Sequence, residues 1–312
     1  MASRFLDAIA DIARHLPLVR RDPLAALDSL AARAGYHHHV DLAYGDEGEQ
    51  RLDLYVPNEG DGGGRRSAVV FFHGGRWTFG QKEEYRFVAQ ALASRGHVVA
   101  VCDYRKFPGV RFPAFVEDGA AAIAWALEHL PGHGVDPRCI FVMGHSAGAH
   151  IAALAIMDRR YTARHGVDPD HLAGLILMSG PFDFFPIKGS DLRKIFGPEE
   201  NHPESQPLRF ARSGLPPMLF LHGRRDRTVH PFNSARMASA IRDRGGRART
   251  ILYDFVSHTN ILGALSDRVG FLIAPALDDI TTFLERRRRE IQDGGGSAVS
   301  PSSSPGKGSP PG

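Results

Sequence analysis

The sequence is poor in cysteine, with Cys102 and Cys139 as its only two thiols in 312 residues. Two cysteines cannot build the disulfide framework of a small secreted domain, and we expect both thiols to be buried and reduced in strands. No apolar run approaches the ~20 residues that span a bilayer, and the first residues lack the continuous apolar core of a signal peptide. We therefore expect a cytoplasmic protein without stable membrane insertion.

The chain also has little net charge. It carries +3 overall, and the run Arg286–Arg289 alone accounts for more than this excess. A nearly neutral body offers no broad basic face for nucleic acid. No phosphate-binding glycine loop is present, and the adjacent histidines 37–39 would point to opposite faces of a strand. We therefore expect no nucleic-acid partner, no cofactor and no metal.

Apolar runs typical of strands alternate with segments that have helical periodicity, which predicts an α/β fold. The pattern favours a mostly parallel central sheet with helices on both faces and an antiparallel start. Strands are predicted at 38–44, 50–56, 68–72, 98–103, 139–143, 173–179, 217–222 and 249–254, and helices at 83–94, 114–130, 147–157, 231–244 and 272–289.

Composition divides the chain into three parts. Residues 1–35 form an N-terminal helical segment, with helices predicted at 3–16 and 23–34. Residues 36–290 are predicted to form the α/β domain. Residues 291–312 are rich in Gly, Ser and Pro and cannot bury enough apolar surface to order, so we predict a disordered tail.

The most informative segment is Gly144-His145-Ser146-Ala147-Gly148, which matches the pattern G-x-S-x-G between a predicted strand and a predicted helix. The serine of this pattern sits on a sharp turn that requires strained backbone angles and neighbours without side chains. The following helix directs its first N–H groups and its positive dipole end at developing negative charge. The pattern predicts Ser146 as a catalytic nucleophile.

A second glycine-rich segment, 73–77, follows the predicted strand 68–72. A serine hydrolase needs backbone N–H donors aimed at the oxyanion of its tetrahedral intermediate. One donor is normally the residue after the nucleophile, here Ala147, and another comes from an earlier strand–helix loop. The candidates in that loop are Gly74, Gly75 and Arg76. His73 is expected to hold the loop rather than to react.

Asp226 and His258 are the predicted acid and base. Both follow the carboxyl ends of predicted strands, where ligands bind in open α/β sheets, and the chain order Ser, Asp, His is that of α/β-hydrolases. His258 would take the proton of Ser146 and return it to the leaving group, while Asp226 would orient the imidazole. The alternatives are Asp254 and Asp183 for the acid, and His222 and His230 for the base.

With these motifs the chain resembles the α/β-hydrolase esterases that include hormone-sensitive-lipase-like carboxylesterases, kynurenine formamidases and plant isoprenylcysteine methylesterases. The resemblance runs from about residue 41 to 287 and also includes the segments 50–57, 103–105 and 136–138. Hormone-sensitive-lipase-like enzymes usually carry HGGG, whereas here Arg76 and Trp77 follow the two glycines. This departure favours the formamidase and methylesterase side and leaves open which N–H groups bind the oxyanion.

The sequence therefore predicts a carboxylic ester hydrolase that acts through an acyl-enzyme on small-molecule esters with short acyl chains. The alternatives are an arylformamidase-like amidase and a non-catalytic scaffold. The predicted substrate-binding residues are Trp77, His145, Phe182 and Phe184. In related esterases N-terminal helices cap the active site, so the resemblance implies the same for residues 1–35, with contact to a membrane surface as the alternative. The oligomeric state is not predicted.

Overall fold

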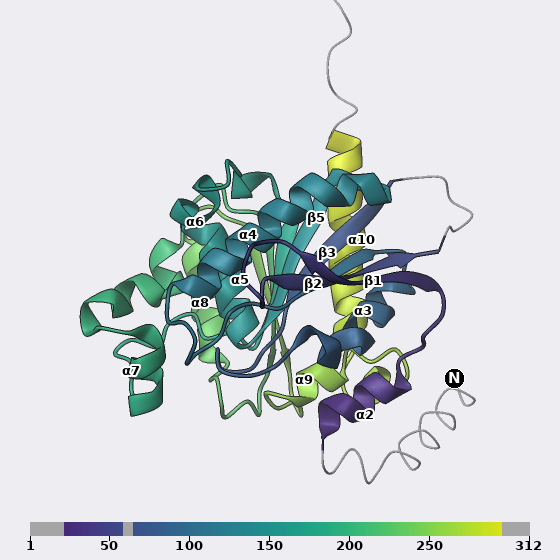
Figure 1. The fold of residues 1–312 in the computed structure, drawn as a ribbon. Coiled ribbons are helices and arrows are strands. Elements are labelled where there is room, and N and C mark those ends of the chain that lie inside the picture. The colour runs from purple at the N-terminus through teal and green to yellow at the C-terminus, as the bar shows by residue number, and fades with distance from the viewer. Residues whose placement is uncertain (1–21, 59–64, 295–312) are drawn as a thin grey trace, which may run out of the picture.

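The computed structural model describes residues 22–58 and 65–294 of the chain. Its centre is one eight-stranded sheet with the order β1-β2-β4-β3-β5-β6-β7-β8 (Figure 1). The strands are β1 (Tyr36–Ala43), β2 (Arg51–Pro57), β3 (Arg66–Phe72), β4 (Val98–Cys102), β5 (Val135–His145), β6 (Gly174–Met178), β7 (Met218–Gly223) and β8 (Ala248–Tyr253).

The direction of the strands confirms the predicted sheet. β1 pairs antiparallel with β2, and β2 pairs antiparallel with β4. All pairs from β4 to β8 are parallel. The carboxyl ends of these six strands therefore meet at one edge of the sheet, and the loops that follow them lie close together.

Helices cover both faces of the sheet, as predicted. α4 (Ala114–His129), α5 (Ala147–Met157) and α8 (Phe232–Arg242) pack on one face, while α3 (Arg86–Ala93) and α10 (Ala276–Gly294) pack on the other. Alternate residues of β3 serve the two cores, since Val70 and Phe72 belong to the first and Val69 and Phe71 to the second. Burial on both faces explains why the strand reads as a continuous apolar run.

Shorter helices lie in the connections. They are α2 (Pro23–Leu30), α6 (Arg159–Ala163), α7 (Ser190–Phe196), α9 (Asn260–Gly263), η1 (Lys82–Tyr85), η2 (Leu130–His133), η3 (Pro169–His171), η4 (Glu199–Ser205), η5 (Pro207–Phe210) and η6 (Gly270–Leu272). α2 lies within the helix predicted at 23–34, whereas the predicted helix 3–16 lies outside the described residues. No helix in the described ranges is long and apolar enough to cross a membrane.

Two features differ from the prediction. No element was predicted between the strands 173–179 and 217–222, but the structure has α7, η4 and η5 there. α10 begins at Ala276 rather than at residue 272 and continues through the start of the predicted tail to Gly294. The partly buried Ile291 packs against the core, which gives the last turn of α10 an apolar contact that the composition of the tail does not reveal.

Two glycines allow α5 to approach the sheet closely behind the sharp turn. A Cβ atom on Gly148 would lie 2.1 Å from the carbonyl oxygen of Phe72 on β3. A Cβ atom on Gly144 would lie 2.4 Å from the carbonyl oxygen of Gly148. In both cases the obstacle is backbone, which cannot rotate away as a side chain can. These two positions therefore fix the distance between α5 and the strands that support it.

We expect Gly148→Ala to lower the free energy of unfolding by about 1–3 kcal/mol, the usual cost of overpacking. Gly132→Ala is the matched control, because a Cβ atom there would meet nothing within 4 Å, and its effect should be close to zero. Urea denaturation of both variants measures the difference. Equal stabilities would show that α5 can shift without cost.

Candidate active site

Ser146 lies at the turn between β5 and α5. Its backbone angles are φ 52° and ψ −116°, a region that costs a non-glycine residue on the order of 1–3 kcal/mol. The turn is held by hydrogen bonds from the Ser146 N–H to Met178 O (2.9 Å) and from the His150 N–H to Ser146 O (3.1 Å). The surrounding sheet and helix thus keep the serine in a strained conformation that presents its hydroxyl beyond the strand ends.

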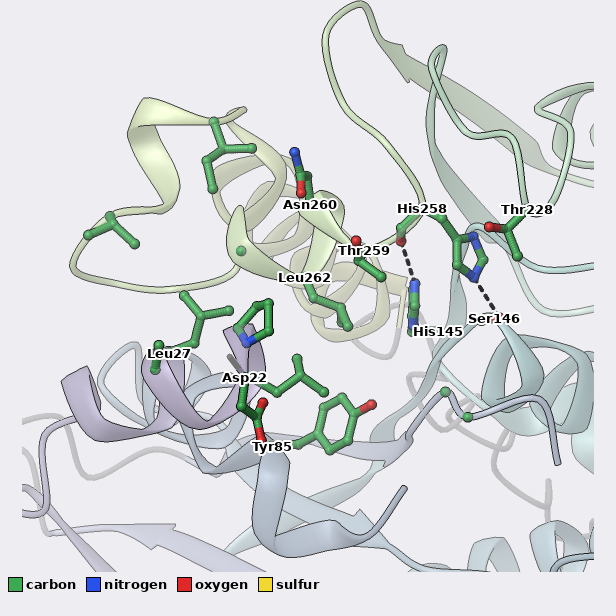
Figure 2. A pocket seen from close by; sticks show the side chains of 18 of the residues that line it. Asp22, Leu27, Tyr85, His145, Ser146, Thr228, His258, Thr259, Asn260 and Leu262 are labelled. Carbon is green, nitrogen blue, oxygen red and sulfur yellow. Dashed lines mark hydrogen bonds between the residues drawn. The ribbon is translucent and has the colours of Figure 1, made fainter. Parts of the chain in front are cut away.

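The structure brings the predicted nucleophile, base and acid together. His258 Nε2 lies 2.9 Å from Ser146 Oγ, and His258 Nδ1 lies 2.7 Å from Asp226 Oδ2. Figure 2 shows the imidazole of His258 directed at the serine. The alternative acids lie elsewhere, because Asp254 pairs with Arg224 and Asp183 pairs with Arg236.

The carboxylate of Asp226 is buried and receives hydrogen bonds at both oxygens. Oδ1 accepts from the N–H groups of Thr228 (2.9 Å) and Val229 (2.8 Å). Oδ2 faces His258 and also lies 3.1 Å from His222 Nε2. Burial alone would raise the pKa of Asp226, but the hydrogen bonds from His222, His258 and the backbone outweigh it and hold the pKa well below its usual range. The acid therefore stays ionised and can stabilise a cation on His258.

His222 supports the acid and does not contact the nucleophile. Its Nδ1 lies 2.8 Å from Ser234 Oγ, while its Nε2 lies near both Asp226 and Val229 O. The two acceptors at Nε2 assign the proton to that nitrogen, so Nδ1 accepts from the serine hydroxyl. His230, the other alternative base, accepts a hydrogen bond from the Phe232 N–H and is likewise not at Ser146.

His145, predicted as a substrate-binding residue, contacts the catalytic loop. Its Nε2 donates to the carbonyl oxygen of His258 over 2.9 Å (Figure 2). Burial, together with the neighbouring His258, lowers the pKa of His145 to about 3. The ring therefore stays neutral at neutral pH and keeps a single N–H, which it gives to the backbone of His258. His145 also lines the adjoining cavity.

The glycine-rich loop after β3 lies against the serine. Gly75 has φ +130° and Arg76 has φ 52°, and Gly75 O accepts from the N–H groups of Thr78 and Phe79. Within the described part of the chain, the N–H groups of Gly75, Arg76 and Ala147 donate to no protein acceptor. These are three of the four predicted oxyanion donors, and they are available to a ligand.

His73 fixes the position of this loop through its buried side chain. Its ring is fully buried, with one nitrogen 2.6 Å from Gly74 O and the other 3.0 Å from the Asp103 carboxylate. The ring stacks between Tyr85 and Tyr104, at centroid distances of 5.5 and 4.6 Å. The contacts with Asp103, Tyr85 and Tyr104 join the loop to neighbouring elements.

A cavity of about 570 Å³ adjoins Ser146 and extends under α2. Most of its wall is apolar, and Figure 2 shows that Leu27 of α2 and Leu262 of α9 face the same space. The hydroxyl of Tyr85 and the carboxylate of Asp22 are among the few polar groups there. The apolar wall consists of Pro23, Leu24, Ala26, Leu27, Leu30, Phe79, Leu262, Val269, Leu272 and Ile273.

Three residues predicted to bind substrate do not line this cavity. Trp77 packs edge-on against Phe196 with the ring centroids 4.9 Å apart, and Phe184 lies 5.2 Å from the same ring. Phe182 is fully buried against Phe220. The aromatic cluster belongs to the core on the α5 face of the sheet, so the small pocket expected from these side chains does not form beside Ser146.

The sequence did not identify the residues that form the cavity wall. They come from α2, η1, α9 and η6, which are far apart in the chain. One signal was present, because Leu24, Leu27 and Leu30 recur at the spacing of one helical face. Their partners across the cavity have no comparable pattern.

The parallel sheet, the serine at the β5–α5 turn, and the acid and histidine after β7 and β8 are the arrangement of an α/β-hydrolase. A family model described as BD-FAE matches residues 52–241, and the chain belongs to this family.

Among curated proteins, the chain is similar to an isoprenylcysteine alpha-carbonyl methylesterase of Arabidopsis thaliana, with 32% identity over 70% of this chain and 56% of that protein. It is 25% identical to esterase LipQ of Mycobacterium tuberculosis, over 85% of this chain and 66% of that protein. The chain thus spans little more than half the length of the plant proteins that it matches.

Solved esterase structures share the fold. Esterase 2 of Thermogutta terrifontis aligns with a TM-score of 0.66 and 28% identity, over 86% of this chain and 98% of that one. An esterase of Pyrobaculum calidifontis aligns with a TM-score of 0.70 and 25% identity, over 85% and 90% of the two chains.

We expect Asp226→Asn to lower kcat/KM for an ester by about 10⁴-fold, because an amide can neither stabilise the imidazolium nor select the correct tautomer. Asp254→Asn is the matched control, since this carboxylate is exposed and pairs with Arg224. A larger loss in the control than in Asp226→Asn would assign the acid to position 254.

The Tm of Asp226→Asn should also differ from that of wild type in its dependence on pH. Because the folded-state pKa of Asp226 is depressed, its contribution is present above the unfolded pKa of ~3.9 and is lost as pH falls toward the folded value. The difference in Tm between wild type and Asp226→Asn should therefore be constant near neutral pH and should narrow below about pH 4.

Proposed function

We propose that the protein hydrolyses carboxylic esters, with Ser146 as nucleophile, His258 as general base and Asp226 as the orienting acid. The observation that carries the proposal is the continuous hydrogen-bonded chain from Ser146 Oγ through His258 to Asp226, at the mouth of an apolar cavity. The esterases among its relatives and among the similar solved structures support the same class of reaction.

In this mechanism Ser146 Oγ attacks the acyl carbon while His258 Nε2 takes the hydroxyl proton. The N–H groups of Gly75, Arg76 and Ala147 receive the oxyanion. His258 then donates its proton to the leaving alcohol, which departs and leaves an acyl-enzyme. A water molecule repeats the sequence on the acyl carbon and releases the acid.

The substrate is proposed to be an ester with one bulky apolar side and one short side. The cavity under α2 has the volume and apolar lining of a small-molecule site, with few polar groups to fix orientation. The plant relative is named for a methyl ester of isoprenylcysteine, and esterase 2 of Thermogutta terrifontis has been solved with butyrate and with propionate bound. The preference for short acyl chains, predicted from the sequence, applies here only if the acyl group is the short side of the ester, and it stays a prediction.

The test of the activity is the hydrolysis of p-nitrophenyl acetate by wild type and by Ser146→Ala. Loss of the nucleophile should lower the rate by about 10⁴-fold or more, and circular dichroism should show an unchanged fold. N-formylkynurenine and simple esters should be compared with the same wild-type protein. Faster turnover of the formamide would favour an amidase, and equal background rates in both proteins would contradict the nucleophile.

The position of the bulky group can be tested by narrowing the cavity. Two esters are compared, p-nitrophenyl decanoate with its long chain on the acyl side and geranyl acetate with its long chain on the alcohol side. We expect Leu27→Trp to lower kcat/KM about tenfold or more for the ester whose long chain lies under α2. Hydrolysis of p-nitrophenyl acetate should change little. Ser29→Trp is the matched control, because Ser29 lies on the same helix but is exposed and does not line the cavity. Equal effects of the two variants would place the substrate elsewhere.

A further inference from the structure

Exposed apolar side chains gather around the mouth of the active site. Eight large apolar residues are exposed in the described ranges, and all except Val40 on β1 lie in segments that follow the carboxyl ends of β3, β6, β7 and β8. We call six of these seven residues the apolar rim, namely Phe79, Phe185, Phe232, Phe255, Leu272 and Ile273. Phe271 has a further contact and is not counted in the rim.

The residues of the rim lie close to the active-site loops in sequence and in contacts. Phe255 has 75% of its surface exposed and lies three residues before His258. Phe232 begins α8, whose Asn233 accepts hydrogen bonds from the backbone of Phe182 and Asp183 and so joins the loops after β6 and β7. Single exposed hydrophobic residues are common, but a group confined to one face marks an interaction site.

Exposed arginines accompany the rim. They are Arg76, Arg225, Arg227 and Arg268. In the part of the chain that the structure describes, none of the four lies within 4.0 Å of a carboxylate. Arg225 instead stacks over the ring of Phe255 at 4.7 Å. The same loops pair Arg224 with Asp254, so the four other guanidinium groups are solvated and available to an anionic partner.

The rim continues into the cavity. Phe79, Leu272 and Ile273 are exposed and also line the space beside Ser146. A hydrocarbon group that leaves an apolar phase at the rim can therefore reach the serine without crossing water. A folded protein seated on the rim would close this entrance, whereas a lipid surface would supply the apolar group that the cavity accepts.

We propose that this face docks on an anionic lipid surface, with the apolar rim at the headgroup–acyl boundary and the arginines on anionic headgroups. The partner follows from the continuity of rim and cavity and from the unpaired positive charge. The proposal rests on the proposed function for the choice of a lipid ester source, but the docking itself needs no catalysis.

The test is sedimentation of the full chain carrying Ser146→Ala with vesicles of phosphatidylcholine, alone or mixed with phosphatidylglycerol. The inactive variant separates docking from turnover, so a failed esterase assay and a failed docking assay are distinct results. We expect binding to the mixed vesicles and much weaker binding to phosphatidylcholine alone. Raising the salt concentration should weaken the binding, since added ions screen exposed charges.

Two pairs of substitutions test the two parts of the surface. Phe232→Ser with Phe255→Ser should lower the partition coefficient about tenfold or more. Arg225→Gln with Arg227→Gln should lower it about fivefold for each arginine, on the anionic vesicles only. The matched controls are Val40→Ser, on the edge strand, and Arg244→Gln, an exposed arginine two residues after the end of α8. With Ser146 restored, both pairs should hydrolyse p-nitrophenyl acetate at the wild-type rate.

Three results would overturn the proposal. The first is equal vesicle binding by the rim variants and their controls. The second is that the full chain does not bind vesicles. If a chain that begins at residue 22 binds while the full chain does not, the occupant of the rim would be residues 1–21. The third is a dimer that dissociates in Phe232→Ser with Phe255→Ser without any vesicle binding, which would make the rim an interface between two copies.

Discussion

The geometry of the site depends on how closely α5 approaches β3. The carbonyl oxygen of Phe72 occupies the space that a side chain at position 148 would need, and the carbonyl of Gly148 does the same at position 144. Because Gly144 and Gly148 have no side chains, the chain can reverse its direction at Ser146 and hold this residue at a positive φ. A wider turn would lower the strain at Ser146, but it would move the start of α5 and its N–H groups away from the oxyanion.

The histidine that serves this serine is fixed from two sides. Asp226 holds the imidazole at Nδ1, while His145 holds the backbone of the same residue through its carbonyl oxygen. The two residues that make these contacts differ in charge, since Asp226 stays ionised and His145 stays neutral. A cation on His258 is therefore stabilised by its acid without a second positive ring beside it. The same pentapeptide thus provides both the nucleophile and a residue that positions its base.

The sequence was sufficient to predict the triad but not the cavity. Ser146 lies in a local pattern, and Asp226 and His258 follow apolar runs whose parallel pairing brings their ends to one edge. That inference needs only the direction of the strands. The wall of the cavity depends instead on α2 lying across the same space from α9 and η6, which are more than two hundred positions away in the sequence. Trp77 illustrates the limit, because two consecutive positive φ values at Arg76 and Trp77 turn its ring into the core.

If the substrate occupies this cavity as proposed, its size depends on a short helix and not on the sheet. α2 has eight residues, too few for a helix that is stable on its own. It is held on the domain by the ion pair of Asp28 with Arg86 on α3 and by the hydrogen bond from Tyr36 to Ala32 O. The proposed catalytic groups instead follow the ends of β5, β7 and β8. Changes in α2 can therefore alter which esters fit while the distances between Ser146, His258 and Asp226 stay the same.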